Sequence, residues 1–302
     1  MADNRFELKK GGGKHYCPAC GQRRFVRYVD TWTGEEVADE VGRCDRESSC
    51  GYHLRPREYF RNGGLRPAEA TKPAPKPNPE PLFISPETMQ ASFTAYTHNN
   101  FCQWLCRVFG ETRALELTFA YRVGTSKHWP GACVFWQIDE AGRVRRGKVM
   151  LYNPETGRRV KEPFNHVTSA HWLLGMKDRK PQPCLFGLHL AGADRSRPVA
   201  VVESEKSAII GAGFVPEYTW TATGGCGNLK PELFTPLRGR TVMLFPDLGA
   251  FDKWNERAKG LPGVQVNDIL ERRASAQDRA AGLDVADYFL REHGNVSARA
   301  KC

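Results

Sequence analysis

The chain has 302 residues, which is room for about two domains. Hydrophobic residues make up 40% and charged residues 26%, as in soluble proteins that bury a sizeable core. The formal net charge of +10 favours a polyanionic partner, although many soluble proteins are basic without one. The sequence has no membrane-spanning stretch and no signal-peptide core, so we expect a cytoplasmic protein without membrane contact. Its ten cysteines are then reduced.

Four cysteines near the N-terminus predict a structural zinc site. Two are separated by two residues and followed by glycine, and the other two are spaced more loosely. Four thiolates suit tetrahedral zinc. The predicted ligands are Cys17, Cys20, Cys44 and Cys50, with His15 and His53 as alternatives. The other interpretation, four unrelated buried thiols, is less favoured because this block has too little apolar content to fold without a metal.

The block over residues 1–60 is predicted to be a zinc ribbon that binds nucleic acid. A hairpin over Phe25–Arg43, turning near Thr33 and Gly34, would separate the cysteine pairs. Its arginines and aromatic rings suit a single-stranded nucleic acid, and a solvated basic face explains them nearly as well. The arginines that we single out as candidate phosphate contacts are Arg23, Arg24 and Arg27.

The next two segments differ sharply in composition. Residues 61–81 are rich in proline and nearly free of large apolar side chains, which predicts an extended linker. Helical patterning over residues 88–117 follows, and then strands are expected at residues 133–138 and 147–152. We therefore expect an α+β subdomain over residues 82–195.

Apolar strands alternate with helices over residues 196–302. Strands without polar alternation, each followed by a helix, predict an α/β domain whose mainly parallel sheet is covered on both faces. The expected strands are residues 198–202, 218–223, 241–245 and 264–266, and the expected helices are residues 204–211, 228–237, 251–258, 269–281 and 285–292. Sites in such sheets lie at the carboxyl ends of the strands.

Acidic residues stand at that edge. Glu203 directly follows one predicted strand, Asp247 follows another, and Asp252 begins the next helix. Carboxylates at one sheet edge can share a magnesium or manganese ion. Lys206 is a candidate phosphate contact, although a lysine in a first helical turn is more often only solvated. A glycine-rich turn lets backbone N–H groups approach an anion closely. The glycines concerned are Gly224, Gly225 and Gly227.

A strand that ends before Glu203 is followed by a glycine-rich turn and then by a strand that leads to Asp247. This order resembles the TOPRIM domain of DnaG-type primases, phage helicase-primases, topoisomerases and some nucleases. Upstream, residues 134–144 and 184–190 are similar to the segments that lead into TOPRIM in primase catalytic cores. A zinc module followed by a linker is also the primase arrangement. The likeness extends to TOPRIM-like, primase-related proteins of Bacteroidetes mobile elements.

The resemblance implies roles and a function. Glu203 would be the general acid/base or metal-bridging carboxylate, and Asp247 a metal ligand. Gly249 stands where the family has a second aspartate, so Asp252 would have to reach back to the metal. The implied activity is primer synthesis on single-stranded DNA from nucleotides, in replication of a mobile element, with a replicative helicase as a further partner. The alternatives are a non-catalytic DNA-binding factor, which the departure at Gly249 favours, and a TOPRIM nuclease.

Overall fold

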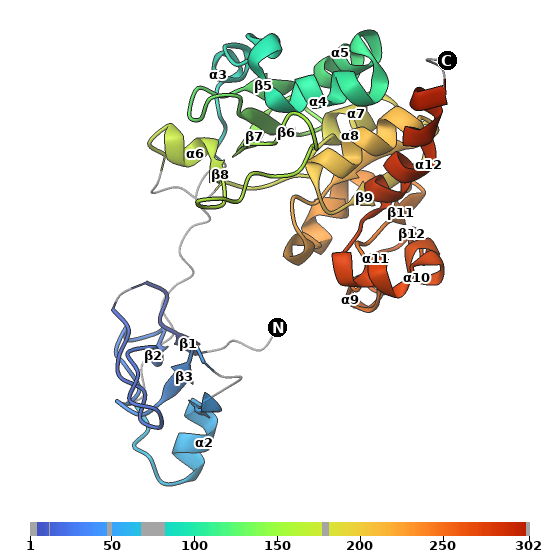
Figure 1. Ribbon diagram of the computed structural model, residues 1–302. Helices are drawn as coiled ribbons and strands as arrows, with labels where there is room; N and C mark the ends of the chain where they lie inside the picture. The colour runs from blue at the N-terminus through green and yellow to red at the C-terminus, as the bar shows by residue number, and fades with distance from the viewer. Residues whose placement is uncertain (1–4, 12, 47–49, 68–81, 177–180, 300–302) are drawn as a thin grey trace. The chain divides into compact units, whose positions relative to one another are not determined.

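The chain divides into two compact units, Met1–Pro79 and Glu80–Cys302, in the computed structural model (Figure 1). The structure describes residues 5–11, 13–46, 50–67, 82–176 and 181–299. Most of the predicted linker, residues 68–81, lies outside the described residues. Among the described residues, no helix combines the length and the apolar character that crossing a membrane requires.

The first unit is a zinc ribbon built on an antiparallel sheet. Its strands, in the order β1-β2-β3-β4, are β1 (Phe6–Leu8), β2 (Phe25–Asp30), β3 (Gly42–Cys44) and β4 (His53–Leu54), followed by helix α2 (Pro56–Arg61). The predicted hairpin is confirmed, because β2 pairs with β3 and Phe25 lies opposite Cys44. At its turn, Gly34 has a φ of +81° and donates its N–H to the carbonyl of Asp30.

The second unit begins with helices packed beside an antiparallel sheet. The helical segments are α3 (Pro86–Gln90), the 3₁₀ turn η1 (Tyr96–His98), α4 (Asn100–Phe109) and α5 (Glu111–Ala120). The sheet has the order β5-β6-β7-β8, with β5 (Val123–Thr125), β6 (Cys133–Ile138), β7 (Val144–Met150) and β8 (Val167–Ser169). Short helices α6 (Ala170–Leu173) and α7 (Leu188–Ala193) follow.

A parallel sheet forms the C-terminal part, as predicted. Its order is β10-β9-β11-β12, and each pairing is parallel. The strands are β9 (Val199–Val202), β10 (Thr219–Ala222), β11 (Val242–Leu244) and β12 (Val264–Val266). The segments between and after them are α8 (Glu205–Phe214), the 3₁₀ helices η2 (Cys226–Asn228) and η3 (Pro231–Leu237), α9 (Phe251–Ala258), α10 (Ile269–Arg273), α11 (Ala276–Ala281) and α12 (Val285–Arg299).

Both faces of this sheet are covered, which explains its continuous apolar strands. Ala200 and Val202 of β9 point into a core shared with α8, α12 and the helices α4 and α5. Val199 and Val201 point to the opposite face, which α7, η3 and α9 cover. Because all four side chains are fully buried, no position on β9 tolerates a polar residue until the strand ends at Glu203.

Three predicted helices differ from the structure. The helical pattern over residues 88–117 is broken where Ala95 and Gly110 adopt positive φ angles of 54° and 78°. The segment over residues 228–237 forms 3₁₀ turns, since prolines lie at the start and inside η3. The helix expected over residues 269–281 is two helices, because Ser275 caps the start of α11.

Candidate functional site

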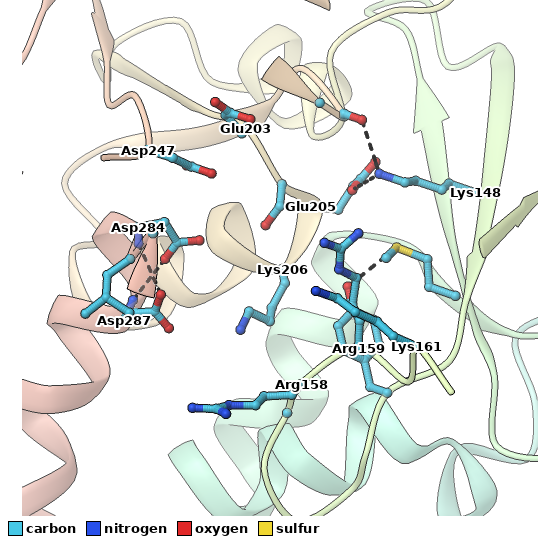
Figure 2. A pocket seen from close by; sticks show the side chains of 18 of the residues that line it. Lys148, Arg158, Arg159, Lys161, Glu203, Glu205, Lys206, Asp247, Asp284 and Asp287 are labelled. Atoms are coloured by element: carbon cyan, nitrogen blue, oxygen red, sulfur yellow. Dashed lines mark hydrogen bonds and ion pairs between the residues drawn. The ribbon is translucent and has the colours of Figure 1, made fainter. Parts of the chain in front are cut away.

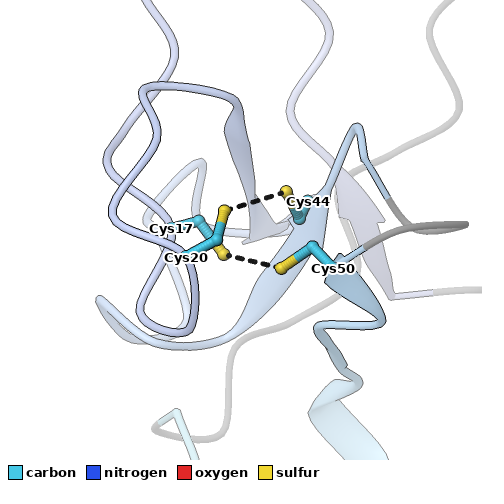
Figure 3. Close-up of side chains that lie close together, drawn as sticks. All are labelled: Cys17, Cys20, Cys44 and Cys50. Carbon is cyan, nitrogen blue, oxygen red and sulfur yellow. Dashed lines mark hydrogen bonds between the residues drawn. The ribbon is translucent and has the colours of Figure 1, made fainter.

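The four predicted zinc ligands lie together in the first unit (Figure 3). Their sulfur atoms are all within 4.8 Å of one another. The Sγ atoms of Cys17 and Cys50 are 3.7 Å apart, and those of Cys20 and Cys44 are 4.0 Å apart. A zinc tetrahedron with bonds of about 2.3 Å has edges of about 3.8 Å, so the donor set fits a structural zinc ion.

The two alternative zinc ligands are engaged elsewhere. The ring of His53 stacks on Tyr28 and shares a hydrogen bond of 3.0 Å with its hydroxyl. His15 lies 3.6 Å from a carboxylate oxygen of Glu36.

The arginines predicted to contact nucleic acid differ in their surroundings. Arg27 forms ion pairs of 2.9 Å with both Glu36 and Asp39, so its charge is already balanced. Arg23 and Arg24 are exposed, and Arg23 donates to the backbone carbonyl of Lys14. Of the three, Arg23 and Arg24 present their charge to a ligand most directly.

A cavity of about 850 Å³ lies at the carboxyl edge of the parallel sheet in the second unit (Figure 2). Glu203, Asp247, Asp284 and Asp287 gather on one side of it, and the cations lie on the other side, where Glu205 is paired with Lys148. The acidic side chains that line it are Glu203, Glu205, Asp247, Asp284 and Asp287, and the basic ones are Lys148, Arg158, Arg159, Lys161 and Lys206.

Three elements deliver the four carboxylates that face the cations. Glu203 follows β9 and Asp247 follows β11, as the sequence predicts for adjacent parallel strands. Asp284 and Asp287 come from the start of α12. The backbone N–H of Leu248, next to Asp247, donates to the carbonyl of Leu283. This bond ties the end of β11 to the start of α12 and brings the aspartates of the two elements to one wall.

Asp284 and Asp287 are oriented by their own helix. Each accepts a hydrogen bond from the backbone N–H of the other, at 3.0 and 3.1 Å, which caps the first turn of α12. Ser207 of α8 donates its hydroxyl to Asp284 at 2.5 Å. These bonds occupy some of the carboxylate lone pairs and leave both residues lining the cavity.

The carboxylate wall concentrates negative charge away from water. Burial, together with the charges of Glu203, Asp284 and Asp287, raises the pKa of Asp247 to about 8. Burial also raises the pKa of Glu203, an effect that Lys253 partly opposes and Asp284 reinforces. The pKa of Asp287 is raised by burial and by Asp284. A cluster with this repulsion is stabilised when a proton or a cation enters it.

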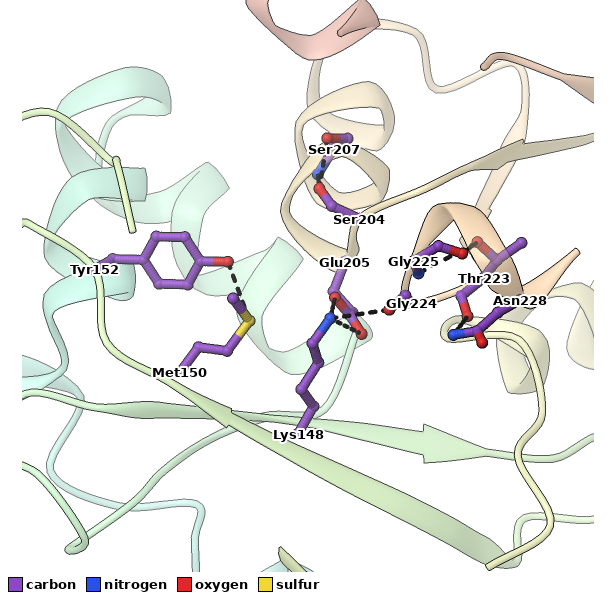
Figure 4. A network of polar contacts seen from close by, with 10 residues as sticks. All are labelled: Lys148, Met150, Tyr152, Ser204, Glu205, Ser207, Thr223, Gly224, Gly225 and Asn228. Atoms are coloured by element: carbon purple, nitrogen blue, oxygen red, sulfur yellow. Dashed lines mark hydrogen bonds and ion pairs between the residues drawn. The ribbon is translucent and has the colours of Figure 1, made fainter. Parts of the chain in front are cut away.

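The glycine-rich turn is held by a buried ion pair (Figure 4). Lys148 of β7 donates to Glu205 at 2.9 Å and to the carbonyl of Gly224 at 3.2 Å, and Glu205 is only 1% exposed. Thr223 donates its hydroxyl to the carbonyl of Gly225, and Asn228 donates to the carbonyl of Thr223. Lys148 and Thr223 thus bind the carbonyls of Gly224 and Gly225, and the N–H of Gly225 donates back to the hydroxyl oxygen of Thr223 at 3.5 Å.

Gly224 and Gly225 line the cavity, whereas Gly227 does not and is exposed. Gly224 has a φ of +76°, and a Cβ atom there would lie 3.2 Å from Glu205. The conformation and the close approach both require glycine at position 224.

The basic wall is positioned by Trp104. The Nζ atom of Lys206 lies over its ring, 5.3 Å from the centroid. Gly157, with a φ of +63°, packs so closely on the same ring that a side chain at position 157 would collide with it. The following residues, Arg158 and Arg159, line the cavity. One buried tryptophan thus fixes both the helix lysine and the start of the basic loop.

Asp252 is not brought to this cavity. It lies in the first turn of α9 with an exposed side chain and does not line the cavity. Gly249, where the related pattern has an aspartate, adopts a φ of +82° and donates its N–H to Glu271 at 2.9 Å. The expectation that Asp252 reaches back to the metal therefore does not fit the structure, which places Asp284 and Asp287 beside Asp247 instead.

The sequence reasoning missed these two aspartates and the basic loop. Asp284 and Asp287 follow no strand, so the edge rule did not point to them. Their spacing of three residues at a helix start is a capping pattern and was a usable signal. Arg159 and Lys161 alternate with Val160 after β7, a pattern that is indistinguishable in sequence from an ordinary solvated loop.

Two family models match parts of the chain. Residues 99–248 match a domain of unknown function, DUF6371, and residues 4–64 match a zinc beta-ribbon finger. No curated protein matches.

The chain shows distant structural similarity to solved structures of primases. The primase fragment of the bacteriophage T7 primase-helicase is 16% identical, with a TM-score of 0.38, over 84% of this chain and 88% of that one. The Aquifex aeolicus primase, comprising zinc-binding and RNA polymerase domains, is 12% identical, with a TM-score of 0.36, over 96% and 84%. A DnaG primase catalytic domain bound to single-stranded DNA is 15% identical, with a TM-score of 0.36, over 62% and 74%.

Proposed function

We propose that this chain is a metal-dependent, primase-like nucleotidyltransferase that joins nucleotides on a single-stranded DNA template. The observation that carries the proposal is the cavity with a carboxylate wall facing a cationic wall. Nucleotidyl transfer needs divalent cations beside the reacting oxygens and positive charge around the triphosphate. An entirely acidic or an entirely basic pocket would meet only one of these needs.

The carboxylate wall suits magnesium or manganese. Both ions prefer oxygen ligands and are held by a few carboxylates, with positions left for phosphate and water. Glu203, Asp247, Asp284 and Asp287 would hold them, and the burial and mutual repulsion that raise the pKa of Asp247 are what a bound cation would relieve. The bound ions would activate the attacking 3′-hydroxyl and neutralise the leaving pyrophosphate.

The chain's own cations and backbone would orient the substrate. Arg158, Arg159, Lys161 and Lys206 face the carboxylates across the cavity, at the side where a triphosphate would lie. Gly224 and Gly225 line the same cavity, and without side chains they would let a phosphate oxygen approach the backbone of the turn closely.

The two aspartates of α12 bear on the choice of function. The alternative of a non-catalytic DNA-binding factor drew part of its support from the missing carboxylate at Gly249. Asp284 and Asp287 supply acidic oxygens to the same wall and so support the catalytic proposal. The resemblance in sequence extends the proposal to primer synthesis in replication of a mobile element, with a replicative helicase as partner, and to a cytoplasmic setting.

A primer-synthesis assay tests the proposal. The full-length protein is incubated with single-stranded DNA, labelled ribonucleotides and magnesium or manganese, and we expect short labelled products. Glu203→Gln should abolish synthesis while single-stranded DNA binding persists, because it removes a charge and keeps the side-chain shape. Asp252→Asn removes an equivalent charge outside the cavity and serves as the matched control.

Two results would contradict the proposal or its site. If the wild-type protein makes no product and gains no thermal stability from either metal, the enzymatic function is wrong. If Asp252→Asn abolishes synthesis as Glu203→Gln does, the carboxylate set is wrong.

A further inference from the structure

Four aromatic rings form a surface cluster beside the second sheet of the chain. We call His128, Trp129, Phe164 and His166 the aromatic cluster. The ring of Phe164 stacks on His166, with centroids 4.3 Å apart and planes inclined by 21°. Trp129 meets His166 edge-on at 5.1 Å, and His128 lies 4.4 Å from Trp129. Two separate loops, between β5 and β6 and between β7 and β8, build the cluster.

The cluster is anchored on its inner side and open on its outer side. Trp129 packs against the core formed by Ile84, Trp136 and Ala170 among others. Phe164 is 54% exposed, and His128 is also exposed. Single exposed apolar side chains are common on soluble proteins. Four rings in mutual contact, with Phe164 stacked on His166 and more than half exposed, are better explained by a ligand with flat faces.

The loop that carries Phe164 and His166 also carries the basic wall of the cavity. Lys161, which lines the cavity, precedes Phe164 by three residues, a span of about 10 Å at most. The N–H of His166 donates to the carbonyl of Val160, and the N–H of Leu151 donates to the carbonyl of His166. These bonds fold the loop back against the end of β7, so the cations and the aromatic rings of the loop lie on one short hairpin.

The charge of this loop selects the kind of ligand. Between residues 158 and 166 there are three cations, at Arg158, Arg159 and Lys161, and one carboxylate, at Glu162. Lys127 adds a further exposed cation beside His128. Rings next to a surplus of positive charge suit a polyanion that has exposed bases, which is a single-stranded nucleic acid.

We propose that the aromatic cluster stacks bases of the single strand whose phosphates the adjacent cations bind, so that the template leaves the cavity across Phe164. This inference rests on the proposed function, because it names the path of the same template. Stacking does not depend on base identity, so the aromatic cluster would bind single-stranded DNA of any sequence. Removing one stacked base from its ring should weaken binding by about tenfold.

The test measures the preference for bases at constant phosphate charge. The full-length protein is titrated with a labelled oligodeoxythymidylate and with an abasic oligomer of the same length, without divalent metal, so that no chemistry occurs. We expect the wild-type protein to bind the base-bearing strand at least about tenfold more tightly. Phe164→Ala combined with His166→Ala should remove most of this preference and leave the dependence of affinity on salt unchanged.

Two further variants control the measurement. Phe119→Ala removes a phenylalanine that is 52% exposed on α5, outside the aromatic cluster, and should keep the full preference. Phe164→Trp keeps a stacking ring at the proposed position and should also keep it.

A double variant that retains the wild-type base preference would overturn the inference, as would an equal loss of affinity for both oligomers. The proposed function can fail separately. If the wild-type protein makes no primers, and the double variant has lost the base preference that the wild type shows, the catalytic proposal is refuted and the inference about the aromatic cluster is supported. Primer synthesis together with an unchanged preference would refute the cluster alone.

Discussion

Replacing Asp247 with asparagine should remove most of the pH dependence of the stability of the second unit between pH 5 and pH 7. The pKa of Asp247 is about 8 in the folded protein, against about 3.9 for an aspartate in an unfolded chain. The folded state therefore holds a proton that the unfolded state releases. The stabilisation from that proton is complete below pH 4 and is lost as pH rises toward 8.

The size of the effect follows from the separation of the two pKa values. Between pH 5 and pH 7 the free energy of unfolding should fall by at most about 1.4 kcal/mol per pH unit, or about 3 kcal/mol in all. For a unit of this size that is a fall in Tm of about 6–12 °C. Asp247→Asn keeps the shape, cannot ionise and should lose most of this slope.

Tryptophan emission during thermal unfolding is the assay, because Trp220 and Trp254 are buried in the second unit. It is recorded from pH 5 to pH 8 with divalent metals chelated, and again with added magnesium or manganese. The metals should stabilise the wild-type protein more at pH 8 than at pH 6, because they must displace the proton from Asp247. Equal pH slopes for wild type and Asp247→Asn would refute this reasoning.

Three other predictions concern zinc, the buried ion pair and the template. Cys17→Ser should lower the zinc content, measured by elemental analysis, from about one ion per chain toward zero, and full retention would remove the site. Lys148→Met should lower the free energy of unfolding by about 3–5 kcal/mol in denaturant titrations, because it leaves Glu205 buried without its partner. A loss below about 1 kcal/mol would contradict the stabilising role of this ion pair. Binding of single-stranded DNA should weaken steeply with salt, and Arg158→Ala with Arg159→Ala should reduce the slope of log K against log salt by about 1.4; an unchanged slope would show that these arginines do not contact phosphate.

Much of the fold follows from local sequence signals. The strand over residues 199–202 is apolar at every position, and only a sheet buried on both faces gives such a run. The cysteine pairs around a hairpin predicted the ligand set, since a small block without a core needs a metal. The positions of Glu203 and Asp247 at the sheet edge were predictable, because Glu203 directly follows β9 and Asp247 lies three residues after the end of β11.

What could not be predicted depends on contacts distant in sequence. Asp284 reaches the cavity because Leu248 and Leu283 share a hydrogen bond and because Ser207 holds its carboxylate. Asp252 looked suitable from its place after β11, but its side chain is exposed and does not line the cavity. Side-chain direction at a helix start depends on how the helix docks, and sequence spacing does not contain that information.

The location of bound manganese tests the central claim most directly. Crystals of the full-length protein grown with manganese would show the ion through its anomalous scattering. We predict a peak ligated by Glu203 and Asp247 together with Asp284 or Asp287. A cavity without manganese, or an ion bound at Asp252 instead, would contradict the account.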